Sequence, residues 1–191
     1  MREAISSPSR RTPLTETGSE LDSHAQDNAV VIRLLAPRAR FSLRIDLSLL
    51  ARAKTIAGFA LGMPINRYTT AAGWTAMRLG PDEWLVIDES GADLMGALAK
   101  SGVLHSATDV SHRNVAIIVS GPGAEATIST GCPQDLSLEV FPVGACSRTL
   151  FGKAEIVLFR TEDDTFRVEC WRSFADFVFG LLAEGAEDAA H

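Results

Sequence analysis

The chain has 191 residues, 46% of them hydrophobic, and carries 18 basic against 24 acidic side chains, a net charge of −6. This content suffices for one good core, whereas the acidic balance and the absence of a basic cluster argue against a nucleic-acid partner. No apolar run approaches the length of a transmembrane helix, roughly 18 residues, so no membrane partner is expected.

Residues 1–28 are predicted to form a disordered N-terminal arm. They hold only six apolar side chains among Ser, Thr, Pro and mixed charges, too few to offset the entropy that ordering would cost. They also contain no continuous apolar segment of signal-peptide length. The expected location is therefore the cytoplasm.

The next part of the chain predicts a strand followed by a helix. Residues 41–45 alternate apolar and polar side chains, which is typical of a half-buried strand. Ser48 is expected to cap a helix that ends at Gly58. The predicted buried face of this helix consists of Leu49, Ala53, Ile56 and Ala57.

Two further strands, a helix and a last strand complete a first half. Residues 74–79 and 84–87 are predicted strands around a turn at residues 80–82. Residues 91–100 form a helix with Leu94, Met95 and Leu98 inward, and residues 103–110 form a strand. The resulting order is β-α-β-β-α-β, the split ferredoxin-like arrangement.

The second half is predicted to repeat this order. Residues 115–119 are apolar on both faces, as in a central strand of a covered sheet. A short helix over 122–130 and a hairpin of strands near 154–160 and 165–170 follow. Shifting residues 83–100 by 82 positions places them on 165–182. The second half lacks an evident final strand and has an extended stretch over 131–146 instead.

A last helix is predicted to start at Ser173, with Asp176 in a capping-box-like position. Its inward residues share one helical face: Phe174, Phe177, Val178, Leu181 and Leu182. Residues 184–191 are rich in Ala and acids, and we expect them to fray.

The predicted fold class is α+β, with two pseudo-repeated ferredoxin-like β-α-β-β-α-β halves. Residues 29–183 are expected to form a single compact domain of two halves, about 29–112 and 113–183. The disordered arm (1–28) and the frayed tail (184–191) flank it.

Residues 121–126 match the pattern G-x-G-x-x-A after a strand and before a helix, where a dinucleotide fingerprint occurs. The predicted helix is only about two turns long. Pro122 removes one of the amide donors that would bind phosphate. An ordinary turn into a helix is therefore favoured, and a nucleotide-binding module remains an alternative.

No catalytic or metal-binding set is predicted. Asp109, Ser111 and His112 lie too close along one extended segment to converge as a triad; they are expected to satisfy backbone groups at a strand end. His105 and His112 lack metal-ligand spacing. The cysteines Cys132, Cys146 and Cys170 form no paired motif, so we expect them to be reduced and structural.

The three tryptophans could stack a pterin or a flavin ring, but tryptophan far more often fills cores and interfaces. Trp74, Trp84 and Trp171 are therefore assigned to packing. Trp84 in particular follows a tight turn and starts an apolar strand, so its ring is expected to be buried against a helix.

Five motifs occur in order along the chain: residues 79–85 (LGPDEWL), 109–111 (DVS), 131–136 (GCPQDL), 148–153 (RTLFGK) and 172–177 (RSFADF). In this order they resemble the gamma subunit family of heterotetrameric sarcosine oxidase, a relative of the tetrahydrofolate-dependent aminomethyltransferase fold. The resemblance covers roughly residues 30–183.

The resemblance implies a complex that oxidises sarcosine with O₂ to glycine and hydrogen peroxide and gives 5,10-methylenetetrahydrofolate. FAD, FMN, NAD and tetrahydrofolate would be held by the alpha, beta and delta partner subunits. This chain would then be a non-catalytic assembly subunit that binds no cofactor. A free-standing tetrahydrofolate-dependent aminomethyl-transfer protein remains an alternative.

The motif residues are candidates for structural or interface roles rather than for catalysis, cofactor binding or metal binding. They are Asp82, Glu83, Trp84, Asp109, Arg148, Arg172, Phe174 and Asp176.

Overall fold

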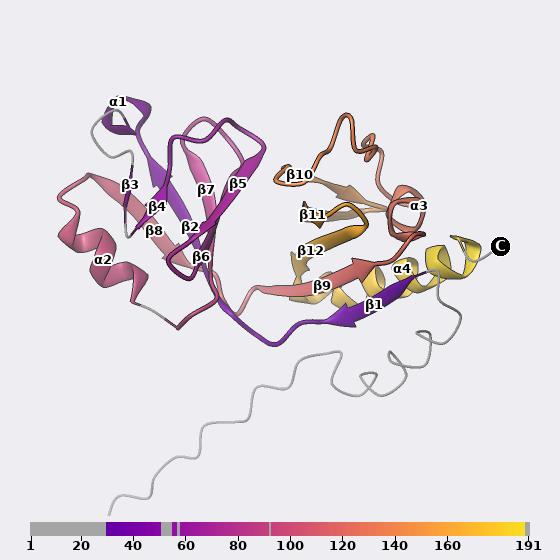
Figure 1. Cartoon of the computed structure of the whole chain (residues 1–191). Helices are drawn as coiled ribbons and strands as arrows, with labels where there is room; N and C mark the ends of the chain where they lie inside the picture. Colours follow the sequence, from indigo (N-terminus) through magenta and orange to yellow (C-terminus); the bar gives the residue numbers. More distant parts are fainter. Residues whose placement is uncertain (1–29, 51–54, 57, 92, 190–191) are drawn as a thin grey trace, which may run out of the picture.

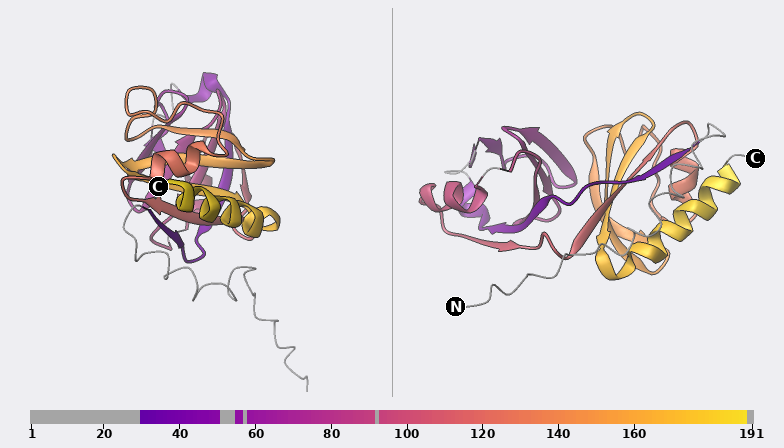
Figure 2. Two further views of the ribbon diagram at one scale, coloured as in Figure 1. Left: turned by 90° about the vertical axis from the view of Figure 1, so that its right-hand side faces the viewer. Right: turned by 90° about the horizontal axis from the view of Figure 1, so that it is seen from below.

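The computed structural model describes residues 30–50, 55–56, 58–91 and 93–189. The arm predicted over residues 1–28 lies outside the described residues. Two five-stranded antiparallel sheets face each other, and the main helices cover their outer faces (Figures 1 and 2). This mixture of antiparallel sheets and segregated helices confirms the predicted α+β class.

The first sheet has the strand order β5-β6-β7-β2-β8. These strands are β5 (Arg67–Ala71), β6 (Trp74–Arg78), β7 (Glu83–Asp88), β2 (Ala39–Ile45) and β8 (His105–Asp109). Helix α2 (Leu94–Lys100) covers the outer face and places Leu94 and Leu98 in the same core as Trp84. Without the edge strand β5, the order is that of a ferredoxin-like unit.

The second sheet has the order β1-β9-β12-β11-β10. Its strands are β9 (Asn114–Ser120), β10 (Cys146–Phe151), β11 (Ala154–Glu162), β12 (Thr165–Trp171) and β1 (Val31–Leu34). Helices α3 (Ala124–Ser129) and α4 (Ala175–Ala189) lie on its outer side (Figure 1). As predicted, β9 is central, between β1 and β12.

Strand β1 supplies the final strand that the second half lacks in sequence. It pairs antiparallel with β9, with Val31 opposite Ser120 and Leu34 opposite Ile117. Figure 2 shows the chain leaving β1 and crossing to the other sheet. The predicted boundary, which placed β1 in the half 29–112, is therefore wrong for this strand: it completes the sheet of the other half.

The predicted repeat with a shift of 82 residues is visible in both side chains and strands. It places Trp84 of β7 on Phe166 of β12, and both residues are fully buried. It also places Arg78 on Arg160, whose guanidinium carbons lie 5.3 and 4.4 Å from the centroids of those two rings. Each half thus uses the same arginine-over-ring contact in its core.

The helix predicted from Ser48 to Ala57 does not reach Ile56. Helix α1 is described over Leu47–Leu50, its start is capped by Asp46, which accepts a hydrogen bond from Ser48 N at 2.8 Å, and residues 51–54 lie outside the described residues. Ile56 instead lies in β3 (Thr55–Ile56), paired with β4 (Phe59–Ala60). Gly58 has a φ of +87° and forms the tight hairpin turn between these strands. Ala53 and Ala57 lie outside the described residues.

Two further predictions about helices need correction. Met95 is 43% exposed, because the short helix α2 turns only Leu94 and Leu98 fully inward. Helix α4 runs to Ala189, past residue 183 where fraying was predicted. The end of α4 packs closely on α3, because a Cβ on buried Gly185 would lie only 2.9 Å from the Thr127 carbonyl oxygen of α3.

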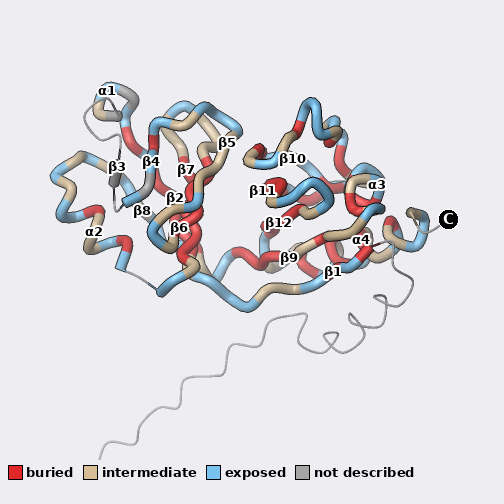
Figure 3. The backbone as a smooth tube through the Cα atoms, in the orientation of Figure 1, coloured by how far each residue is buried: buried red, intermediate tan, exposed pale blue. Residues whose placement is uncertain are grey.

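Both faces of the seam, meaning the facing surfaces of the two sheets, contribute to a shared core. Met77, Leu85 and Ile87 of the first sheet pack with Val157 and Phe159 of the second. Figure 3 shows buried backbone running through the strands of both sheets, with exposure concentrated in loops. The two halves therefore bury apolar surface against each other.

A buried ion-pair network also crosses the seam. Arg40 of β2, which is 1% exposed, donates from Nε to Glu169 Oε2 of β12 at 2.6 Å. Arg167 donates from Nε to Glu169 Oε1 at 3.0 Å and from Nη1 to Glu89 Oε1, just after β7, at 2.7 Å. Glu169 thus lies between two guanidinium groups and joins the sheets.

Replacing Trp84 tests the core of the first half. Trp84→Ala removes a fully buried ring and should lower the free energy of unfolding by about 3–5 kcal/mol. Trp84→Phe is the control, because Phe occupies the repeat-related position 166 and because the indole Nε1 has no hydrogen-bond partner among the described residues. Urea unfolding followed by circular dichroism measures both; an unchanged midpoint for Trp84→Ala would contradict the assignment.

Two glycines of α4 provide a matched pair for the α3–α4 contact. Gly185→Ala should destabilise the protein, because the new methyl group meets the α3 backbone. Gly180→Ala should stabilise it by up to about 1 kcal/mol, because the site is exposed, has open space and gains helix propensity. Thermal melting distinguishes the two; a stabilising Gly185→Ala would mean that α4 does not pack on α3.

The seam network is tested by Glu169→Gln. The neutral amide leaves Arg40 and Arg167 without their buried carboxylate, which should cost about 3–5 kcal/mol of unfolding free energy. Glu155→Gln is the control: its side chain is 50% exposed and 3.8 Å from Arg148 Nε, so its loss should cost below about 1 kcal/mol. Equal urea midpoints for the two variants would show that the network does not hold the sheets together.

Candidate functional site

Three predicted motif residues meet at one end of the seam. Asp82 lies in the turn before β7 and Glu83 is the first residue of that strand. Arg44 of β2 donates to Asp82 Oδ1 and Glu83 Oε2, each at 3.1 Å. Arg148 of β10 donates from Nη2 to Glu83 Oε1 at 2.5 Å. This hydrogen bond raises the pKa of Arg148. Glu83 therefore links the two sheets within the chain.

Trp84 lies inside the fold, directly after this ion-pair cluster. Its side chain is fully buried, and Arg78 covers the ring. Arg78 is itself held by the carbonyl of Met63, to which Nη1 donates at 2.7 Å. The Asp-Glu-Trp motif thus combines a surface link between the sheets with a core anchor.

Asp109 ends β8, Ser111 lies in the turn that follows, and both side chains bond to the backbone. Asp109 Oδ1 accepts a hydrogen bond from Ser111 N at 2.8 Å, and Ser111 Oγ accepts one from Arg40 N at 2.9 Å. His112 is exposed next to them. The geometry is that of a capped strand end, with the serine hydroxyl directed to a backbone amide rather than to a base.

The last motif forms the start of α4. A single 3-10 turn, Arg172–Phe174, precedes the helix, and Arg172 N donates to Arg113 O at 2.7 Å. Phe174 packs on the core of the second half. Asp176 is exposed in the first helical turn, where a carboxylate is favourable to the helix dipole. No capping hydrogen bond from Ser173 is described at this end.

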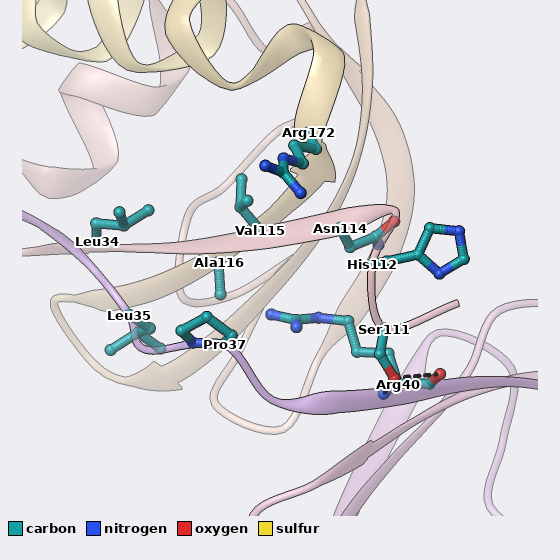
Figure 4. Close-up of a pocket in the computed structure, with 10 residues that line it drawn as sticks. All are labelled: Leu34, Leu35, Pro37, Arg40, Ser111, His112, Asn114, Val115, Ala116 and Arg172. Atoms are coloured by element: carbon teal, nitrogen blue, oxygen red, sulfur yellow. Dashed lines mark hydrogen bonds between the residues drawn. The ribbon is translucent and has the colours of Figure 1, made fainter. Parts of the chain in front are cut away.

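A pocket of about 120 Å³ lies between the β1–β2 connection and β9. Figure 4 shows Arg40 and Arg172 among its lining residues, with Leu34, Pro37 and Ala116 forming apolar wall. Arg40 is already engaged by Glu169 and by the carbonyl of Arg38. A second pocket, of about 140 Å³, lies beside Arg67 and Val140.

These two pockets do not fit tetrahydrofolate or a flavin. Cofactor sites usually measure about 300–1,000 Å³, well above either volume. The tryptophan rings give no stacking platform in the core, since Trp74 and Trp84 are buried. Trp171 is 40% exposed, and the Arg113 guanidinium covers its ring at 5.3 Å.

The glycine-rich turn at residues 121–126 connects β9 to α3. Gly121 has a φ of +108°, and its amide donates to Asp164 O at 3.0 Å, while Ala124 N donates to Gly121 O at 2.9 Å. These amides are used within the fold, and α3 has only six residues. The turn has the geometry of the ordinary connection favoured from the sequence.

The cysteines and the ionisable groups offer no reactive set within the described ranges. The three cysteines are free and buried, and burial raises the pKa of Cys146 and Cys170 to about 12. Among these residues, no group of three or more His, Cys, Asp or Glu side chains could hold a metal ion. No helix described in the structure is long and apolar enough to cross a membrane.

Sequence reasoning missed the residues that matter most to the seam, Arg40, Arg167 and Glu169. For two of them a signal existed in β12, where Phe166, Val168 and Cys170 face the helices and alternate with Arg167 and Glu169. The alternation shows that Arg167 and Glu169 share the opposite face. That face is also buried, which the sequence of one strand does not reveal.

Relatives of this chain are found by sequence. The family model "Sarcosine oxidase, gamma subunit family" matches residues 46–188. Sarcosine oxidase subunit gamma of an Arthrobacter species is 29% identical over 164 residues, covering 83% of this chain and 81% of the relative. Its counterpart from Corynebacterium sp. strain U-96 is 26% identical over 188 residues, covering 94% and 91%.

Solved structures confirm the fold. A chain of the heterotetrameric sarcosine oxidase from Corynebacterium sp. U-96, in complex with pyrrole 2-carboxylate, superposes with a TM-score of 0.82 at 22% identity, covering 95% of this chain and 97% of that one. Aminomethyltransferase T of the glycine cleavage system from Bartonella henselae gives 0.63 at 15% identity, covering 85% and 48%.

The family resemblance inferred from the five ordered motifs is thereby confirmed. Because the family model spans most of the chain, from the end of β2 to the end of α4, the protein belongs to the sarcosine oxidase gamma subunit family.

Proposed function

We propose that this chain is an assembly subunit of a multi-subunit sarcosine oxidase and carries none of the chemistry itself. The observation that carries the proposal is the family match over residues 46–188. The filled seam supports it: Arg40, Glu169 and Arg167 occupy with their own ion pairs the space where two facing sheets could hold a ligand.

In the proposed complex, sarcosine, O₂ and tetrahydrofolate react to glycine, hydrogen peroxide and 5,10-methylenetetrahydrofolate. FAD, FMN, NAD and the folate would be bound by alpha, beta and delta subunits. Asp82, Glu83 and Arg148 would act within this subunit by fixing its two sheets, while Arg172, Phe174 and Asp176 would shape the start of α4. The buried free thiols are compatible with the expected reducing, cytoplasmic location.

Aminomethyl transfer is the second candidate, because the fold of this chain is similar to that of aminomethyltransferase T. The chain spans about half of that protein, and the pockets of about 120 and 140 Å³ are small for a folate. Tetrahydrofolate titration of the isolated chain distinguishes the two candidates.

Expression with and without the large subunits tests the proposal. Alone, the chain should be colourless, free of flavin and inactive on sarcosine; with the others, it should copurify in fixed stoichiometry. Omitting it should lower the yield of assembled complex and its flavin content, and adding back the purified chain should restore both.

The control for the add-back is the Glu169→Gln variant, which should restore assembly only to the extent that it folds. Sarcosine turnover by the chain alone would overturn the proposal. Binding of tetrahydrofolate at micromolar concentration would support aminomethyl transfer in its place. Binding of NAD or ATP would support the nucleotide-binding alternative.

A further inference from the structure

The edge strands β5 and β10 meet where the two sheets approach each other (Figure 1). Arg67 forms an isolated antiparallel bridge with Ala145, and Tyr68 N donates to Gly144 O at 3.1 Å. Beside this contact lies a groove lined by the apolar residues Ile65, Val140 and Phe141 and by the polar residues Asn66, Arg67 and Gln134, and most of its exposed lining is polar. We name it the seam groove.

Hydrogen bonds hold the seam groove in one shape. Cys146 N donates to Asn66 O at 3.0 Å, and the Tyr68 hydroxyl donates to Arg160 O at 3.0 Å. Gln134 is fixed by the Ser147 hydroxyl, which donates to its Oε1 at 2.6 Å. A site held in this way loses little conformational entropy when a partner binds.

Exposed aliphatic side chains lie at the rim of this groove and elsewhere on the loop that carries Val140. Ile65 is 45% exposed and Val140 is 56% exposed at its rim, and Leu138 and Val143 of the same loop are 48% and 47% exposed. The two loops that carry them are tied together by the β5–β10 hydrogen bonds. Exposed apolar patches on a folded protein typically mark interaction sites.

Arg67 places an unbalanced charge in the polar lining of the groove, next to this apolar rim. Three other arginines near the seam each contact a carboxylate: Arg40 contacts Glu169, Arg148 contacts Glu83 and Arg160 contacts Glu125. No carboxylate within ion-pair distance of Arg67 is found among the residues the structure describes. Its neighbour Cys146 is kept protonated by burial, so the thiol supplies no counter-charge.

We propose that the seam groove docks a segment of another subunit that packs aliphatic side chains on the rim of Ile65 and Val140 and brings one carboxylate to Arg67. The groove of about 140 Å³ has room for one acidic side chain rather than for a cofactor. Charge complementarity selects an acidic partner segment, because an arginine in a partly desolvated groove gains most from a bidentate carboxylate. This inference rests on the proposed function, which supplies other subunits.

Two variants of the full chain test the apolar contact and the charge contact separately. Val140→Asp places a charge on the exposed apolar rim, and Arg67→Glu reverses the charge in the groove. Each should weaken association with the other subunits at least about tenfold, as expected for a residue at the centre of an interface. Arg67→Lys, which keeps the charge but loses the bidentate geometry, should retain part of the affinity.

Matched controls come from surfaces remote from the groove. Leu104→Asp introduces the same charge at an apolar residue that is 81% exposed before β8, and Arg33→Glu reverses an exposed charge on β1. Both should assemble like the wild type. Thermal melting of each isolated variant identifies any that fails to fold.

The outcomes separate this inference from the proposed function. If the wild type copurifies and folded Val140→Asp and Arg67→Glu chains do so equally well, the inference is wrong and the assembly role stands. If the wild type itself does not copurify, the proposed function fails. If the variants instead change the oligomeric state of the isolated chain, or if deleting residues 1–28 reproduces their effect, the groove binds a second copy or the chain's own arm, and the inference is overturned.

Discussion

The carboxylate of Glu169 between two arginines is the constraint on which the arrangement of the sheets depends. Its two oxygens bind Arg40 from the opposite sheet and Arg167 from its own strand, away from water. Removing such charges from water costs energy that only good geometry offsets, so the group need not add net stability. It does make other registers of the two sheets costly, because any slip would leave a buried charge alone.

The exchange of β1 gives the same result by a different route. A strand that precedes the first half in sequence completes the sheet of the second half. The first sheet takes all its strands from its own half, whereas the second sheet is complete only with β1, so the chain enters the second sheet before it forms the first. Shared strand, shared apolar core and shared ion pairs explain why the seam is filled and why the two pockets described beside it are small.

Much of this fold follows from the sequence where patterning is strong. The alternation in β2, the apolar run of β9 and the shift of 82 residues predicted strands, helices and repeat. The edge strands β1, β5 and β10 were missed because they are short and half-exposed, with weak alternation. Of the site, the Asp82–Glu83 turn and Arg148 were found, whereas Arg40 and Glu169 lie 129 residues apart and nothing local indicates that they pair.

The placement of β1 has a consequence for how the chain can be cut. In space, β1 stands where a strand after α4 would stand, and Figure 1 shows the start of β1 close to the end of that helix. The strand order is therefore that of two tandem ferredoxin-like units in which the last strand has been moved from the C-terminal end to the N-terminal end of the chain, a circular permutation. A chain that began after β1 and carried this strand behind α4 would have each ferredoxin-like unit continuous in sequence, with every sheet contact retained.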